Sequence, residues 1–127
     1  MTNRLEFEKL VSDVHAARTE GRLDALCALF APHATFKIAG ASEGKPIAIA
    51  AQGNAEIRAW LAVMLKTFKL TRYQRLSLVI DGTRAAVHWR VDIHSKVTGV
   101  VVPTELVDLV EVTDGRVGVY REFFAPC

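Results

Sequence analysis

Hydrophobic residues recur at helical spacing in three segments of the chain. The first segment runs from about residue 3 to 19 and ends before Gly21. A shorter second segment ends at Pro32, which cannot continue a helix. The third begins at Asn54, a good N-terminal cap, and its apolar residues recur at Ile57, Trp60, Leu61, Met64, Leu65 and Phe68. The pattern therefore predicts three amphipathic helices.

Alternating apolar and polar residues predict strands in most of the remaining chain. Residues 34–38 read as a short strand, followed by a loop or loose hairpin over 39–53. The apolar run 47–51 within it is either a short edge strand or a lid over a pocket. Four longer strands are expected at 71–80, 84–96, 100–112 and 116–124, with tight turns at Asp81-Gly82, Thr98-Gly99 and Asp114-Gly115.

This order of elements predicts one α+β domain over residues 1–127. The three helices pack on one face of a curved, mostly antiparallel sheet. A chain of this length buries roughly two thirds of its unfolded surface, so it can form a substantial core.

The segment 84–94 has two chemically different faces. One face carries Val87, Trp89, Val91 and Ile93, and the other carries His88, Arg90, Asp92 and His94. The pattern alone favours packing the apolar face against the helices, which leaves the four ionisable side chains in solvent. The alternative is that the charged row lines a pocket, and the functional interpretation depends on which of the two holds.

Two tight turns allow the registers of the last three strands to be predicted. If Thr98-Gly99 and Asp114-Gly115 are two-residue turns, one sheet face carries two rows, Arg90–Val107–Glu122 and Asp92–Glu105–Phe124. An arginine fork could then bridge two carboxylates. In a pocket such a cluster raises the pKa of at least one carboxyl, which allows a general acid and a general base to coexist.

Composition excludes several classes of partner. The formal net charge is +2 and its charges are interspersed, so we expect no nucleic-acid partner. No apolar run approaches the ~20 residues needed to cross a bilayer, so we expect no membrane contact. The charged residues 1–10 are unlike a secretory signal, which favours the cytoplasm.

Cys27 and Cys127 match no metal or redox spacing. Asp92, His94 and Glu105 form only a loose ligand set, so no metal is expected.

Several motifs resemble those of a known superfamily. The segment 21–36, G-R-L-D-A-L-C-A-L-F-A-P-H-A-T-F, resembles the entry motif of the nuclear transport factor 2-like superfamily. This group includes SnoaL-like polyketide cyclases, ketosteroid isomerases and limonene-epoxide hydrolases. The resemblance covers nearly the whole chain and implies a single SnoaL-like domain, a cone-shaped α+β barrel. It favours an arrangement in which the charged row of 84–94 faces the pocket.

The resemblance also implies residue roles. Arg90-Val91-Asp92, Asp114-Gly115-Arg116 and 120–124 (Y-R-E-F-F) are similar to the limonene-epoxide hydrolase pattern. Asp92 would protonate the epoxide oxygen, Arg90 would bridge, and Glu122 would activate water. Pro103-Thr104-Glu105 resembles the ketosteroid-isomerase segment that bears an oxyanion-binding acid. The other substrate-binding candidates, beside Glu105, are His88, Tyr120, Phe124, Val107, Phe36 and Trp60.

Several positions differ from these relatives, including Arg22, where an acidic helix cap is usual. Limonene-epoxide hydrolases hold their water with a tyrosine and an asparagine, where this chain has Phe36 and Ile38. Ketosteroid isomerases need a base near Ile38 and a tyrosine near Val14. Two function classes therefore remain. One is a cofactor-free acid–base enzyme, a hydrolase, cyclase or isomerase, acting on a small apolar molecule. The other is a non-catalytic ligand-binding or subunit-interaction domain.

The pocket-facing arrangement also predicts how the protein assembles. It leaves the apolar side of 84–94 on the outside of the sheet, together with Phe123. An exposed apolar patch of this kind needs a partner. We therefore expect a homodimer formed through the face around Trp89, Ile93 and Phe123.

Overall fold

The computed structural model describes residues 3–42 and 44–127. The elements are, in chain order, α1 (Arg4–Glu20), α2 (Leu23–Ala28), β1 (Phe30–Ser42), β2 (Lys45–Gln52), α3 (Gly53–Thr67), β3 (Phe68–Asp81), β4 (Arg84–Ser95), β5 (Val101–Thr113) and β6 (Arg116–Pro126). The strands form one sheet in the order β2-β1-β6-β5-β4-β3. Among the strands described, β1 and β6 pair in parallel and the other neighbours are antiparallel. The predicted α+β class, the three helices and the mostly antiparallel sheet are confirmed.

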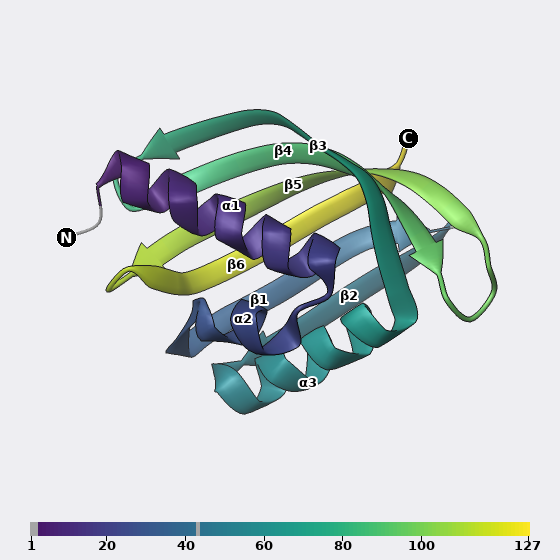
Figure 1. Cartoon of the computed structure of the whole chain (residues 1–127), viewed down its shortest axis with the longest axis horizontal. Coiled ribbons are helices and arrows are strands. Elements are labelled where there is room, and N and C mark those ends of the chain that lie inside the picture. The colour runs from purple at the N-terminus through teal and green to yellow at the C-terminus, as the bar shows by residue number, and fades with distance from the viewer. Residues whose placement is uncertain (1–2, 43) are drawn as a thin grey trace.

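The three helices lie on the same side of the curved sheet (Figure 1). Helix α1 crosses the middle of the sheet, and α3 runs along the β1–β2 end. Helix α1 ends at Gly21, whose φ of 70° forms a left-handed cap that a residue with a side chain adopts less readily. Among the described helices, none is long and apolar enough to span a membrane.

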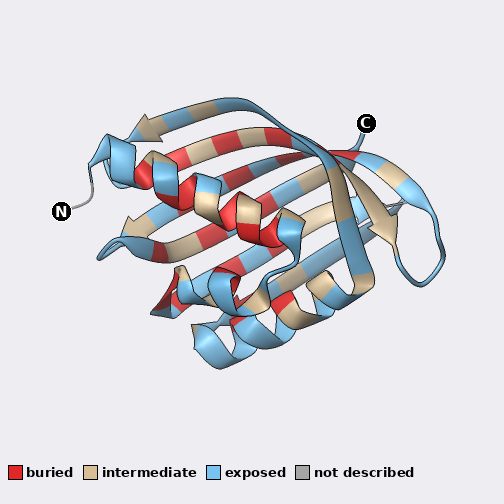
Figure 2. Cartoon of the chain, viewed as in Figure 1, coloured by how far each residue is buried: buried red, intermediate tan, exposed pale blue. Residues whose placement is uncertain are grey.

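The core lies between the helices and the inner face of the sheet. Along the central strands, buried residues alternate with exposed ones (Figure 2). In β4, Val87 and Trp89 are fully buried beside α1 residues such as Phe7 and Val14. The interpretation that the pattern of 84–94 favoured by itself is therefore correct, and the pocket-facing arrangement of its charged row is wrong.

The first hairpin is longer and more regular than predicted. Strand β1 starts at Phe30 and continues to Ser42, and β2 pairs with it as the edge strand. Of the two interpretations of run 47–51, the edge strand is confirmed. Helix α2 ends at Ala28, before Pro32 is reached. Pro32 lies within β1, in the irregular part between the residues that pair with β6, where a strand tolerates proline.

The two registers predicted from turns are both shifted. Strands β4 and β5 are joined by residues 96–100 instead of two residues, so Arg90 lies opposite Glu105 and not Val107. That shift of two residues keeps every side chain on its face. Between β5 and β6 the register shifts by one residue near Gly118, where a bulge interrupts the pairing. An added Cβ on Gly118 would lie 2.2 Å from Thr113 Oγ1, so any other residue there would require Thr113 to move.

The bulge has a direct consequence for the site. A shift of one residue moves each following side chain of β6 to the other face of the sheet. Glu122 therefore lies opposite Asp108 on the buried face, and not opposite Val107 on the outer face.

Candidate functional site

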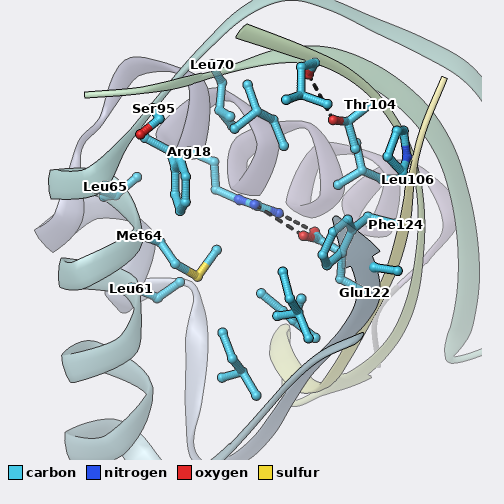
Figure 3. Close-up of a pocket in the computed structure, with 18 of the residues that line it drawn as sticks. Arg18, Leu61, Met64, Leu65, Leu70, Ser95, Thr104, Leu106, Glu122 and Phe124 are labelled. Carbon is cyan, nitrogen blue, oxygen red and sulfur yellow. Dashed lines mark hydrogen bonds and ion pairs between the residues drawn. The ribbon is translucent and has the colours of Figure 1, made fainter. Parts of the chain in front are cut away.

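An apolar cavity of about 420 Å³ lies between α3 and the inner face of the sheet. Leu61, Met64 and Leu65 of α3 line one side, and Leu106 and Phe124 line the opposite side (Figure 3). The volume is within the usual range for a small-molecule site. The largely hydrocarbon wall favours an apolar ligand.

Two charged side chains lie on the cavity wall, which also carries the hydroxyl residues Ser95, Thr98 and Thr104. Arg18 lies in the last turn of α1, and its guanidinium points across the cavity toward Glu122 of β6 (Figure 3). Arg18 Nη1 donates to Glu122 Oε2, and Arg18 Nη2 donates to Glu122 Oε1 at 3.3 Å. Both side chains are nearly inaccessible to solvent, at 8% and 3% exposure. Such a pair is stable in an apolar interior only when it is well satisfied by hydrogen bonds.

A buried hydrogen-bond network extends from Glu122 away from the cavity. The Tyr120 hydroxyl lies 3.2 Å from Glu122 Oε2 and also forms a hydrogen bond with Asp108 Oδ2. Arg18 Nη1 donates to the same hydroxyl oxygen at 3.3 Å. Tyr120 therefore connects the two carboxyl groups, both of which are buried.

His15 of α1 supports the network from the helix side. Its Nε2 lies 2.8 Å from Asp108 Oδ2, and its Nδ1 lies 2.7 Å from the Tyr73 hydroxyl. When Asp108 is ionised it can only accept, so Nε2 carries the proton. The Tyr73 hydroxyl then donates to Nδ1. The imidazole ring also packs on Trp89, with 4.4 Å between ring centroids.

Burial determines the protonation of these groups. It raises the pKa of Glu122 to about 7, while Arg18 opposes the increase and Asp108 adds to it. Burial and the charge of Arg18 lower the pKa of His15 to about 3, so the imidazole is neutral at pH 7. Burial also raises the pKa of Asp108 and that of Tyr120. A carboxyl whose pKa lies near neutrality can both accept and donate a proton.

The catalytic grouping predicted from the sequence is wrong. Arg90 and Asp92 project from the outer face of β4, because Trp89 and Val91 occupy the inner face with 0% and 2% exposure. Asp92 lies 3.8 Å from Arg72, an exposed residue of β3. Of the three predicted catalytic residues, only Glu122 lines the cavity.

The other predicted site residues are divided between the two faces. Glu105 and His88 form a 2.5 Å hydrogen bond on the outer face, where Val107 is also exposed. Trp60 is 39% exposed on α3 and is not part of the cavity wall. The sequence-based placement of these four residues in the pocket is therefore wrong.

The aromatic candidates lie on the inner side of the sheet. Phe124 lines the cavity. Phe36 and Tyr120 are buried and stack on each other, with ring centroids 5.7 Å apart. Phe36 therefore packs against the ring of Tyr120, whose hydroxyl contacts Glu122.

The predicted dimer face is also corrected. Trp89 is fully buried in the core, and Ile93 lines the cavity. Of the three residues predicted for that face, only Phe123 is exposed on the outer side, at 45%.

Sequence reasoning missed Arg18, His15 and Asp108. Each is a polar residue at a position where the local pattern requires an apolar one. His15 and Arg18 are one helical turn apart beside Val14 and Ala17, and Asp108 alternates with buried Leu106 and Val110. Since charged residues are rarely buried without a partner, this conflict was the available signal.

Comparison with known proteins identifies the family. The model of the SnoaL-like domain matches residues 11–119. This chain belongs to the SnoaL-like domain family. No curated protein sequence matches the chain.

Solved structures similar to this SnoaL-like chain have the same fold. An NTF2-like protein from Burkholderia xenovorans LB400 is 21% identical, with 98% of this chain and 93% of that chain covered and a TM-score of 0.80. A proposed isomerase from Bacillus subtilis is 23% identical, with 98% and 90% covered and a TM-score of 0.79. An LEH-like epoxide hydrolase from M. tuberculosis is 16% identical, with 95% and 84% covered and a TM-score of 0.75. At these identities the likeness establishes the fold, and the chemistry has to be argued from the site.

Proposed function

We propose that this SnoaL-like protein is a cofactor-independent acid–base enzyme that acts on a small apolar molecule held in the cavity. Glu122 is the group that transfers the proton. The observation that carries the proposal is the position of the Glu122 carboxyl, on the wall of an apolar cavity, paired with Arg18 and with its pKa raised to about 7. A base with a pKa near the working pH is the most effective proton carrier.

The geometry favours proton transfer next to a carbonyl, as in isomerisation or cyclisation. Glu122 takes a proton from the carbon beside a ketone, and the C–H electron pair forms the double bond of an enolate. Arg18, which also lines the cavity, stabilises the negative oxygen. The protonated Glu122 then returns the proton to the substrate.

Epoxide hydration receives less support. It needs an acid and a base that both reach the substrate. Among the described residues that line the cavity, Glu122 is the only one with a carboxyl group, and Asp92 lies on the other side of the sheet. Phe36 and Ile38 also offer no polar atom to hold a water molecule beside Glu122.

Deuterium exchange tests the proposal without knowledge of the natural substrate. The protein is incubated in D₂O with a panel of small cyclic ketones, and deuterium entering the carbon beside the carbonyl is followed by NMR. We expect the wild type to accelerate exchange, and Glu122→Gln to reduce it about 10²-fold or more. Asp92→Asn, which changes a carboxyl on the outer face, should exchange like the wild type. Equal rates for the wild type and Glu122→Gln would contradict the proposal.

A non-catalytic ligand-binding role is the second candidate. It is favoured by the largely hydrocarbon wall and by the mutual neutralisation of Arg18 and Glu122. Ketones that bind in the cavity but exchange no faster than in buffer would select this role.

We further propose that the protein forms a homodimer through the outer face of the sheet. Val107 and Phe123 lie directly opposite each other on β5 and β6, with 37% and 45% of their surface exposed. Leu109, also on β5, is 39% exposed. A second copy of the chain would cover these apolar side chains.

A further inference from the structure

Asp108 and Glu122 lie directly opposite each other on β5 and β6, and both side chains are buried. The Tyr120 hydroxyl lies between them and forms hydrogen bonds with an oxygen of each. Only Glu122 reaches the cavity; Asp108 is behind it, between Tyr120 and His15. The hairpin formed by β5 and β6 thus places a second carboxyl one hydroxyl group away from the proposed proton carrier.

The charges around this pair do not balance when both carboxyls are ionised. From α1 the pair faces Arg18, a cation, and His15, which is neutral at pH 7. From β3 it faces Tyr73 and, further out, Arg75, which contacts Glu8 near the surface. From β4 it faces the uncharged Trp89. Two buried carboxylates with one buried cation leave one negative charge uncompensated, which is costly unless a proton is taken up.

We propose that Asp108 is the proton partner of Glu122, and that the two carboxyls share one proton through the Tyr120 hydroxyl. In one arrangement Glu122 holds the proton and donates to the Tyr120 oxygen, while Tyr120 donates to the Asp108 carboxylate. In the other, Asp108 holds the proton and donates to Tyr120, while Tyr120 donates to the Glu122 carboxylate. Conversion moves two protons in the same direction, one onto Tyr120 and one off it. The net charge of the cluster does not change.

The rest of the network fits both arrangements. Arg18 Nη1 donates to the Tyr120 oxygen and to Glu122, so it supports the cluster whichever carboxyl is ionised. His15 Nε2 donates to Asp108 when Asp108 is ionised. A concerted step leaves the Tyr120 hydroxyl neutral throughout the transfer, so Tyr120 does not need to ionise.

This inference rests on the proposed function, and it adds a mechanism to it. An apolar ligand that fills the cavity separates Glu122 from solvent. Through Tyr120 the enzyme can still present Glu122 either as a carboxylate that accepts a proton or as an acid that donates one. Asp108 is in this account a positioning residue for the proton, and it does not touch the substrate.

Carbon-13 NMR titration of the aspartate and glutamate carboxyls of the free protein tests the inference. In the wild type we expect the carboxyl carbons of Glu122 and Asp108 to shift in one common step near pH 7, each with the sign of carboxyl deprotonation. In Tyr120→Phe the path is lost, so the step should remain at Glu122 only. Thr104→Val is the matched control, because it removes a buried hydroxyl that donates to the Val102 carbonyl oxygen. It should titrate like the wild type.

A second variant keeps the test decisive if Tyr120→Phe does not fold. Asp108→Asn retains the shape of the side chain and removes its charge, so the pKa of Glu122 should fall by about one unit or more. The inference is overturned if Asp108 stays flat through the Glu122 step in the wild type, or if Asp108→Asn leaves the pKa of Glu122 unchanged. Because no substrate is needed, the result is independent of the deuterium-exchange test. If Glu122 and Asp108 titrate together but the protein does not accelerate deuterium exchange of the ketones, the proposed activity is contradicted and the shared proton is retained.

Discussion

Arg18 and Glu122 are 104 residues apart in the sequence and form a two-point ion pair on the wall of the cavity. The pair joins the end of α1 to β6, and it places the main polar group of the site against a hydrocarbon wall. Its contribution to folding and its role in the chemistry can be separated by experiment.

Removing Arg18 alone should destabilise the protein more than removing both members of this pair. Arg18→Met takes the buried cation away from two buried carboxyl groups, and we expect it to lower the free energy of unfolding by about 3–5 kcal/mol. Glu122→Met leaves Arg18 close to Asp108, so we expect a smaller loss. The double variant should lose less than the sum of the two. Urea denaturation of the four proteins measures the coupling. As a control, the same cycle at the exposed Arg58–Asp24 pair should show a much smaller effect. Additive losses at Arg18 and Glu122 would contradict the buried-pair description.

The stability of the protein should depend on His15 at acid pH. The pKa of His15 is lowered from 6.5 to about 3 in the folded state, so between these values the unfolded chain binds the additional proton. Folding is therefore favoured fully above pH 6.5, and the wild type loses roughly 5 kcal/mol as the pH falls to about 3. His15→Gln should lack this loss. Chemical denaturation of both proteins across this range measures the free energy of unfolding at each pH. The same pH dependence in the wild type and in His15→Gln would contradict a lowered pKa of His15 in the folded state.

The interpretation of the dimer can be tested on the outer face. Replacing Phe123 or Val107 with lysine should shift the protein toward monomer in light scattering, with the helices intact. Leu5→Lys is the control, because Leu5 is 77% exposed and lies on α1, on the helix-covered side of the sheet and away from the proposed contact. A monomeric wild type would end the proposal.

The sequence predicted the order of elements because turns, caps and hydrophobic periodicity are local signals. Asp114 and Gly115 illustrate this, since both adopt positive φ as a tight hairpin requires. The composition of the site was not predictable in the same way. One unpaired residue at Gly118 decides which face Glu122 occupies. An isolated glycine within a strand suggests a bulge, but the two-residue turn at Asp114-Gly115 predicts a register without one.

The partners of Glu122 were missed for a related reason. Asp108 and Arg18 are charged residues at positions where the surrounding pattern is apolar. Only the fold shows that their opposite charges lie close enough to compensate each other. The charged row of β4 is visible in the sequence because its members stand at every second residue of one strand. Adjacent charges on one face of a strand are, however, what a solvated surface also produces.

The central claim is that a small apolar molecule binds on the inner side of the sheet, against Glu122. Intermolecular NOEs between a bound cyclic ketone and methyl-labelled protein test it most directly. We predict contacts to the methyl groups of Met64 and Leu106, which line the cavity, and none to Val107 on the outer face. Contacts to Val107 without contacts to Met64 and Leu106 would contradict the account.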